Sequence, residues 1–328
     1  MFGWLRRSER PSERPSGRAP GASVPEPGPP REDLQALLHQ LEWTVLRRLD
    51  GVLQGEYRSL FRGAGLDLAD LREYQAHDDV RHIDWNVTAR LQVPHVRLHQ
   101  QDREVSAWFL LDMSGSMGFG SGHTRKRDRM LAFVGLMGLL LQRHGNRVGA
   151  LILSPEPGQR LRHVPARMGR RHLLHLMDTV HSVPLPSQPH SSPLAPWLRQ
   201  AQSVLRRRSQ VFVLSDFLGP PGWEQALAGL ARRHDGIAVR LCDPLESALP
   251  EAGLVWLQDA ESGEQMLLDT AEPGLRRRYA EQAQAREAAF AQALASAGMD
   301  GLALSTDDDL VLALRQYLAL RQGRSLHA

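Results

Sequence analysis

From residue 105 onward, short apolar runs alternate with amphipathic segments, and this alternation constrains the fold more than any other feature. The runs "VSAWFLL" (105–111), "RVGALIL" (147–153), "QVFVL" (210–214) and "GIAVRLC" (236–242) have the length and composition of buried strands. Segments with helical spacing stand between them, and the one at 129–144 is apolar on nearly every side. This pattern predicts an α/β fold, a doubly wound and mostly parallel sheet with helices on both faces.

Composition divides the chain into three parts. Residues 1–31 are rich in Pro, Arg, Ser and Gly, which predicts a disordered tail because such a segment has little to bury. Residues 32–104 begin with helical spacing of leucines and continue as short apolar pieces between Gly, Asp and Pro, which suggests a small β-rich module. The α/β domain is predicted over 105–328, with a hairpin where "GLVWLQD" and "EQMLLD" flank "AESG".

Charge and cysteine content narrow the classes of function. The formal net charge is +3, Lys126 is the only lysine, and no basic face with interleaved aromatic residues stands out, so we expect no nucleic-acid partner. The single cysteine, Cys242, excludes an internal disulfide and a Cys-based zinc site, and it fits a reducing compartment. The longest apolar run, Met130–Leu141, is shorter than the ~20 residues of a membrane span. We expect a cytoplasmic protein without a membrane span.

Two of the predicted strands end in an aspartate. Asp112 follows "WFLL" and Asp216 follows "VFVLS", and the carboxyl ends of parallel strands meet at one edge of a sheet, where ligands of doubly wound folds bind. Ser114 and Ser116 follow Asp112 at alternate positions, so their hydroxyls can converge with its carboxylate. Such an oxygen-rich set suits Mg²⁺ (or Mn²⁺). A Ser/Gly turn in which Asp112 caps the next helix would explain the same residues without a metal ion.

A Ser/Pro loop, "SQPHSSPLAPWL", lies between the two aspartates in sequence and opens a helix. Ser191 or Ser192 could supply a third hydroxyl to the same site. Either serine could equally cap the helix, with Pro193 at its first position.

These motifs resemble the metal-ion-dependent adhesion site (MIDAS) of von Willebrand factor A domains. The resemblance implies a von Willebrand A-like, Rossmann-like fold and a metal site whose donors are Asp112, Ser114, Ser116, Ser192 and Asp216. Serine stands where the second loop of that site usually has threonine, and Ser191 is close enough to compete with Ser192.

The chain also resembles the bacterial domain-of-unknown-function 58 family over roughly residues 50–320. The stretches that carry the resemblance are "GLDLADLREYQAHDDVRHIDWNVTAR" and "DPLESALPEAGLVWLQDAESGE". Members of that family are von Willebrand A-like, and their genes usually neighbour those of MoxR-type AAA+ ATPases. The resemblance implies an adaptor for such an ATPase and identifies no substrate.

Dense charges surround a tyrosine and a tryptophan between residues 72 and 90. They could form a surface for a partner, or a network of Arg–carboxylate pairs that fixes the small module to the sheet domain. The residues of this segment are Arg72, Glu73, Tyr74, Asp78, Asp79, Arg81, Asp84, Trp85 and Arg90.

Enzymatic alternatives find little support in the motifs. A Mg²⁺-dependent phosphohydrolase could use Asp112 as its nucleophile, but the haloacid-dehalogenase pattern needs a second acid where Ser114 stands. The glycine-rich stretch after Gly115 lacks the G-x-x-x-x-G-K-[ST] sequence of a phosphate-binding loop. We therefore expect a non-enzymatic protein-interaction protein, in which the metal ion keeps one coordination position for a partner's carboxylate.

Overall fold

The computed structural model describes residues 31–44, 71–75, 80, 83, 85–97, 106–153, 161–186, 193–259 and 261–325. The predicted disordered tail lies almost entirely outside these residues. Within them, no helix combines the length and apolar character that crossing a membrane requires.

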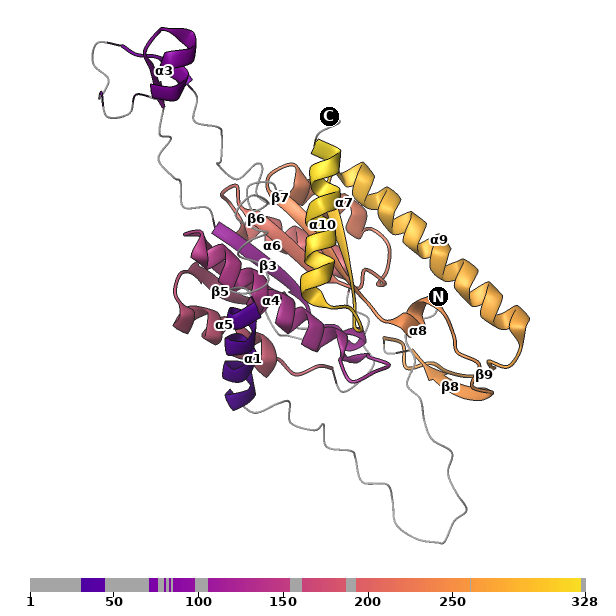
Figure 1. Cartoon of the computed structure of the whole chain (residues 1–328). Coiled ribbons are helices and arrows are strands. Elements are labelled where there is room, and N and C mark those ends of the chain that lie inside the picture. Colours follow the sequence, from indigo (N-terminus) through magenta and orange to yellow (C-terminus); the bar gives the residue numbers. More distant parts are fainter. Residues whose placement is uncertain are drawn as a thin grey trace.

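A six-stranded sheet forms the centre of the molecule (Figure 1). Its strands lie in the order β10 (Asp300–Ser305), β7 (Asp235–Cys242), β6 (Gln210–Ser215), β3 (Ser106–Asp112), β4 (Arg147–Leu153) and β5 (Arg162–Arg167). All neighbours are parallel except β4 and β5, which pair antiparallel. The predicted doubly wound, mostly parallel α/β fold is confirmed. Strand β5 was not predicted, because its sequence "RHVPAR" carries charges and a proline, as edge strands often do.

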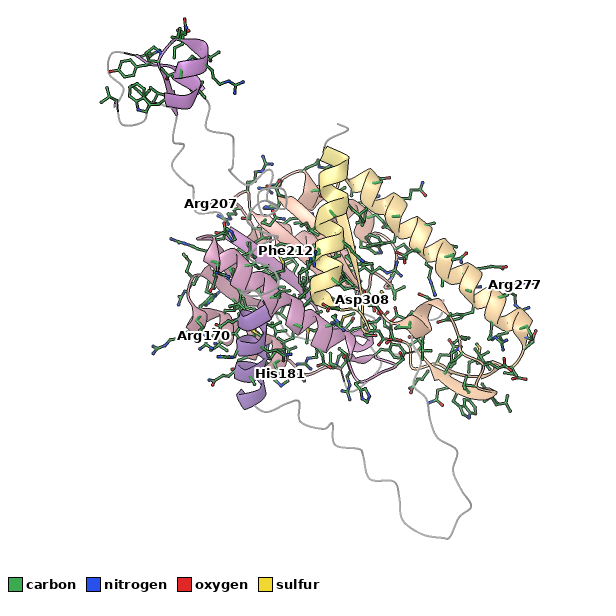
Figure 2. The ribbon with its side chains drawn as sticks, viewed as in Figure 1. Arg170, His181, Arg207, Phe212, Arg277 and Asp308 are labelled. Atoms are coloured by element: carbon green, nitrogen blue, oxygen red, sulfur yellow. The ribbon has the colours of Figure 1, made fainter. Side chains whose placement is uncertain are left out.

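Helices cover both faces of the sheet, and each face has its own hydrophobic core. Alternate side chains of β3 lie in the two cores, because successive residues of a strand point to opposite faces of the sheet. Phe109 and Leu111 lie in one core and Leu110 lies in the other. Phe212 of β6 stacks on Phe109 with ring centroids 5.3 Å apart and lies in the body of the sheet domain (Figure 2). The helices of the first face are α1 (Arg31–Thr44), α4 (Lys126–Arg143), α5 (Arg170–Ser182) and α10 (Leu310–Ser325). Those of the second are α6 (Leu194–Val204), α7 (Trp223–Ala231) and α9 (Pro273–Ala297).

Helix α1 belongs to the core of the sheet domain, although its sequence stands before the small module. Leu34, Leu38 and Leu41 are buried at helical spacing in the first core. A Cβ atom on Gly135 of α4 would lie 2.8 Å from Leu41 Cδ1, so the absence of a side chain there lets the two helices approach closely.

The small module contains β1 (Leu71–Glu73) and β2 (His95–Arg97), paired antiparallel, and the short helix α3 (Trp85–Leu91). Tyr74 donates its backbone N–H to Pro94, and the side chain of Trp85 is largely exposed. Of the charged segment, Asp78, Asp79, Arg81 and Asp84 lie outside the described residues. Whether this segment binds a partner or fixes the module therefore stays a prediction.

The predicted hairpin is present as β8 (Leu254–Gln258) and β9 (Gln265–Asp269), which pair antiparallel. It follows the one-turn helix α8 (Pro244–Ser247) and leads into α9, whose near end lies beside the hairpin (Figure 1). Cys242 at the end of β7 is half-buried. Burial and, next, the carboxylate of Glu246 raise the pKa of this thiol to about 12, so it stays protonated and unreactive.

Candidate functional site

The two strand-end aspartates lie at the same edge of the sheet. Strand β3 runs parallel beside β6 with Leu111 opposite Leu214, so Asp112 and Asp216 come one and two residues past that pair. When the six strands are numbered 1 to 6 by their order along the chain, their spatial order from β5 to β10 is 3-2-1-4-5-6. Strands β3 (number 1) and β6 (number 4) flank the point where this order reverses. The carboxyl edge at such a switch point is where doubly wound folds bind their ligands.

The first loop places three of the predicted donors together in the interior. Asp112, Ser114 and Ser116 are all buried, the least so being Asp112 at 4% exposure. Asp112 Oδ1 accepts the backbone N–H of Ser114 at 2.9 Å, and the hydroxyl oxygens of Ser114 and Ser116 lie 3.0 Å apart. The loop continues as the 3-10 turn η3 (Gly115–Gly118). The interpretation of Asp112 as a helix cap is wrong, because the N-cap of η3 is Ser114 and the N-cap of the next α-helix is Arg125.

The second aspartate is held by the loop after β6. Ser215 donates its hydroxyl to Asp112 Oδ2 at 2.7 Å, which joins the two strand ends directly. Asp216 Oδ1 accepts the backbone N–H of Leu218 at 3.2 Å. Phe217 between them has a φ of 57°, a left-handed conformation that is unusual for a phenylalanine. Its ring packs between Trp223 and Phe290, and these contacts hold the turn that follows Asp216.

A buried ammonium group completes the contacts of Asp216. Lys126, the first residue of α4, has no exposed surface, and its Nζ donates to Asp216 Oδ2 at 3.1 Å. The same Nζ forms an ion pair with Glu246 on α8, whose side chain is also buried. The local sequence pattern predicts no role in the site for either residue. A lone lysine among 39 arginines was the available signal for Lys126, whereas nothing in the sequence marked Glu246.

A third strand-end aspartate, Asp243, connects several segments next to the site through hydrogen bonds. It follows β7, caps α8 by accepting the N–H of Leu245, and accepts the backbone N–H of Ser121 and the hydroxyl of Thr306 at 2.9 and 2.7 Å. Burial opposes its charge, but these hydrogen bonds lower the pKa of Asp243 overall. The strand-end rule that pointed to Asp112 would also have pointed to Asp243 in "RLCD".

The site carries more negative than positive charge. Burial and then Asp216 raise the pKa of Asp112 to about 6, while hydrogen bonds from Ser215 and Ser114 oppose the rise. Burial also raises the pKa of Glu246 to about 8, against the pull of Lys126. Glu261, in the turn between β8 and β9, is half-buried, and burial followed by the charges of Asp216 and Asp112 raises its pKa to about 7. The hairpin therefore brings a further carboxylate into the field of the two strand-end aspartates.

These shifts predict that the protein without added cation loses stability as the pH rises. An acid whose folded-state pKa is raised contributes stability below its unfolded pKa and loses it as the pH rises through the folded value. For Asp112 and Glu246 those folded values are about 6 and about 8. The melting temperature in EDTA should therefore fall between about pH 4, near the unfolded pKa values, and about pH 8, and Glu246→Gln should flatten the upper part of the fall. A melting temperature that rises over this range would contradict the assignment.

The donor chemistry fits a hard divalent cation. Asp112, Ser114, Ser116 and Asp216 offer only oxygen atoms, in a buried place where negative charge is in excess. In the described part of the chain, no three His, Cys, Asp or Glu side chains are grouped to hold a metal ion. The candidate set differs from such a group because half of these four donors are hydroxyls. Ser191 and Ser192 lie outside the described residues, and α6 begins at Leu194 with Pro193 at its N-cap.

The doubly wound sheet, with carboxylates and hydroxyls buried at its switch point, defines an α/β protein with a candidate ligand site at the carboxyl edge of the sheet. The chain belongs to the family described as "Protein of unknown function DUF58", which it matches over residues 70–289. An uncharacterized protein of Mycobacterium tuberculosis is 38% identical over 295 residues, covering 89% of this chain and 91% of the relative. An uncharacterized protein of Mycobacterium avium is 34% identical over 163 residues, covering 50% of this chain and 96% of that protein.

Solved structures with a similar fold are more distant. The conserved hypothetical protein BatB from Bacteroides thetaiotaomicron has a TM-score of 0.39 and 12% identity, covering 67% of this chain and 99% of that one. The VWA domain of SpRpn10 has a TM-score of 0.33 and 11% identity, covering 65% of this chain and 94% of that one. At such TM-scores the likeness says nothing about the function of this chain.

Proposed function

We propose that this chain is a non-enzymatic adaptor that binds a protein partner through a Mg²⁺ (or Mn²⁺) ion. The observation that carries the proposal is the charge of the buried site, where Asp216 and Glu246 flank the ammonium of Lys126 and the carboxylate of Asp112 lies in the field of Asp216. Asp112, Asp216 and Lys126 sum to −1, and ionisation of Glu246, whose pKa is raised to about 8, brings the sum to −2, which one divalent cation would neutralise. The donors would be Ser114 and Ser116 of the first loop, Ser192 of the Ser/Pro loop, and the two strand-end aspartates.

The proposed chemistry is recognition. Asp112 is fixed on both oxygens by Ser114 and Ser215, and this hydrogen bonding holds its carboxylate at one place on the sheet edge. Ser114 and Ser116 present adjacent hydroxyl oxygens, which lie 3.0 Å apart. A bound Mg²⁺ would supply the positive charge that an acidic side chain of a partner needs to form a charge-assisted contact. The partner proposed from the family resemblance is a MoxR-type AAA+ ATPase, with one of its carboxylates completing the coordination.

A pull-down with a purified MoxR-type ATPase tests this proposal. Binding should weaken by about 10- to 100-fold in EDTA, and by a similar factor in Ser114→Ala and Asp216→Asn, because a charge-assisted contact contributes roughly 1.5–3 kcal/mol. Ser209→Ala is a matched control, since Ser209 is also buried but precedes β6 at the opposite edge of the sheet. Equal binding with and without EDTA would refute the metal bridge and would favour the charged segment at 72–90 as the interface.

A further inference from the structure

Lys126 is unusual in both its identity and its position. The chain has 40 Lys and Arg residues together, and Lys126 is the only lysine among them. Its side chain has no exposed surface, whereas lysines are almost never fully buried unless they are paired. An ammonium group is a compact charge on a flexible stem, and it can move between neighbouring acceptors more readily than the planar fork of an arginine.

The ammonium group lies between two carboxylates from different parts of the fold. One is Asp216, a donor of the proposed metal site, at 3.1 Å from Nζ. The other is Glu246 on α8, which is outside the proposed donor set. The ring of Phe119 lies below the same group, with its centroid 6.0 Å from Nζ. Lys126 thus contacts one carboxylate that a divalent cation would need and one that it would not.

The loop between η3 and α4 fixes this arrangement. Phe119 accepts the backbone N–H of Lys126 at 2.9 Å, which brings the start of α4 back to the sheet edge. A Cβ on Gly120 would lie 2.4 Å from the carbonyl oxygen of Thr124, so only glycine permits this tight path. Ser121 is tied to Asp243, and Asp243 caps the helix that carries Glu246. The lysine and its second carboxylate are therefore held together independently of any cation.

We infer that Lys126 is a resident counter-cation that competes with the divalent ion for Asp216, and that Glu246 retains the ammonium when the ion binds. The inference rests on the metal site of the proposed function and adds a residue that sets its affinity. Without the ion, Lys126 neutralises Asp216. With the ion bound, repulsion between two cations at one carboxylate would drive the ammonium toward Glu246. The site would then release its ion more readily than one without the lysine.

Mn²⁺ titration by calorimetry, on the full chain and its variants, tests the inference. Lys126→Met should tighten Mn²⁺ binding by about tenfold or more, and Glu246→Gln should weaken it by about tenfold, because the ammonium then loses its alternative carboxylate. The double variant Lys126→Met/Glu246→Gln should bind like Lys126→Met, since Glu246 acts through the lysine. The double variant also removes both members of the buried pair, so it keeps the test usable if Lys126→Met alone does not fold. Arg125→Met, which removes an exposed positive charge one residue away, should leave the affinity unchanged.

Each outcome has a distinct meaning. If the double variant returns to the affinity of the wild type, the two charges act additively and competition for Asp216 is refuted while the metal site stands. Equal affinity of wild type and Lys126→Met would refute the inference in the same way. If the wild type binds no Mn²⁺ but Lys126→Met does, the proposed function of the native site fails and the competition is supported. Absence of binding in both would overturn both.

Discussion

Replacing Asp112 by asparagine should lower the affinity for Mg²⁺ or Mn²⁺ by at least about 100-fold, because a neutral amide cannot offset the cost of dehydrating the ion. The amide keeps the shape of the carboxylate and one carbonyl oxygen, which can still accept a hydrogen bond from Ser114 or Ser215. The fold should therefore survive. Removal of a buried carboxylate also relieves repulsion with Asp216, so the melting temperature in EDTA should not fall.

Calorimetry with Mn²⁺, together with thermal unfolding, provides the measurement. Asp235→Asn is the matched control, because Asp235 begins β7 at the opposite edge of the sheet and pairs with Arg208 there. The control should bind the ion like the wild type. Equal affinities of Asp112→Asn and wild type would remove Asp112 from the donor set and, with it, the reason to place a cation at this edge.

The second large effect concerns stability. Lys126→Met should destabilise the metal-free protein at about pH 9, above the raised pKa of Glu246, by about 3–5 kcal/mol, because it leaves two buried carboxylates without the ammonium that faces them. The side chains of Asp216 and Glu246 are only 3% and 5% exposed, so water cannot replace the lost charge. For a domain of this size, the melting temperature should fall by on the order of 10 °C. Added Mg²⁺ should recover part of the loss if it binds the folded state.

Differential scanning calorimetry in EDTA, with and without excess Mg²⁺, measures this effect. Arg125→Met should change the melting temperature by no more than a degree or so, as about ±0.5 kcal/mol is usual for exposed positions. A Lys126→Met protein as stable as the wild type would show that the ammonium offsets no buried negative charge here, in which case the charge count of the proposed site is wrong.

The sequence predicted those parts of the fold that a local residue pattern is enough to define. The apolar runs that end in Asp112 and Asp216 predicted two parallel strands and their shared edge, because a strand buried on both faces is apolar throughout and its carboxyl end is defined by the first polar residue. The hairpin at β8 and β9 was predicted for a similar reason, since "AESG" lies between two strand-like runs. Strand β5 was missed because an edge strand with Arg162 and Arg167 at its ends lacks that pattern.

The remaining part of the site depends on contacts between distant segments, which no local pattern reports. Lys126 and Glu246 are 120 positions apart, and they meet because the loop after η3 and the cap of α8 both attach to Asp243. Ser215 precedes Asp216 in "VLSD", but the sequence predicts no role for it. Its role follows from the structure, in which its hydroxyl donates a hydrogen bond to Asp112. Glu261 could not be connected to the strand ends before the direction of the hairpin was known.

The solitary buried lysine has a practical consequence for finding the partner. Amine-reactive cross-linkers couple lysine side chains and α-amino groups, and the one lysine of this chain has no exposed surface. Complexes formed in cells would therefore offer such reagents no lysine of this chain even when binding is tight, and proteome-wide cross-linking surveys based on lysine pairs would under-report this protein. Reagents that couple carboxylates or guanidinium groups suit its surface, where arginine and acidic side chains predominate among the charged residues.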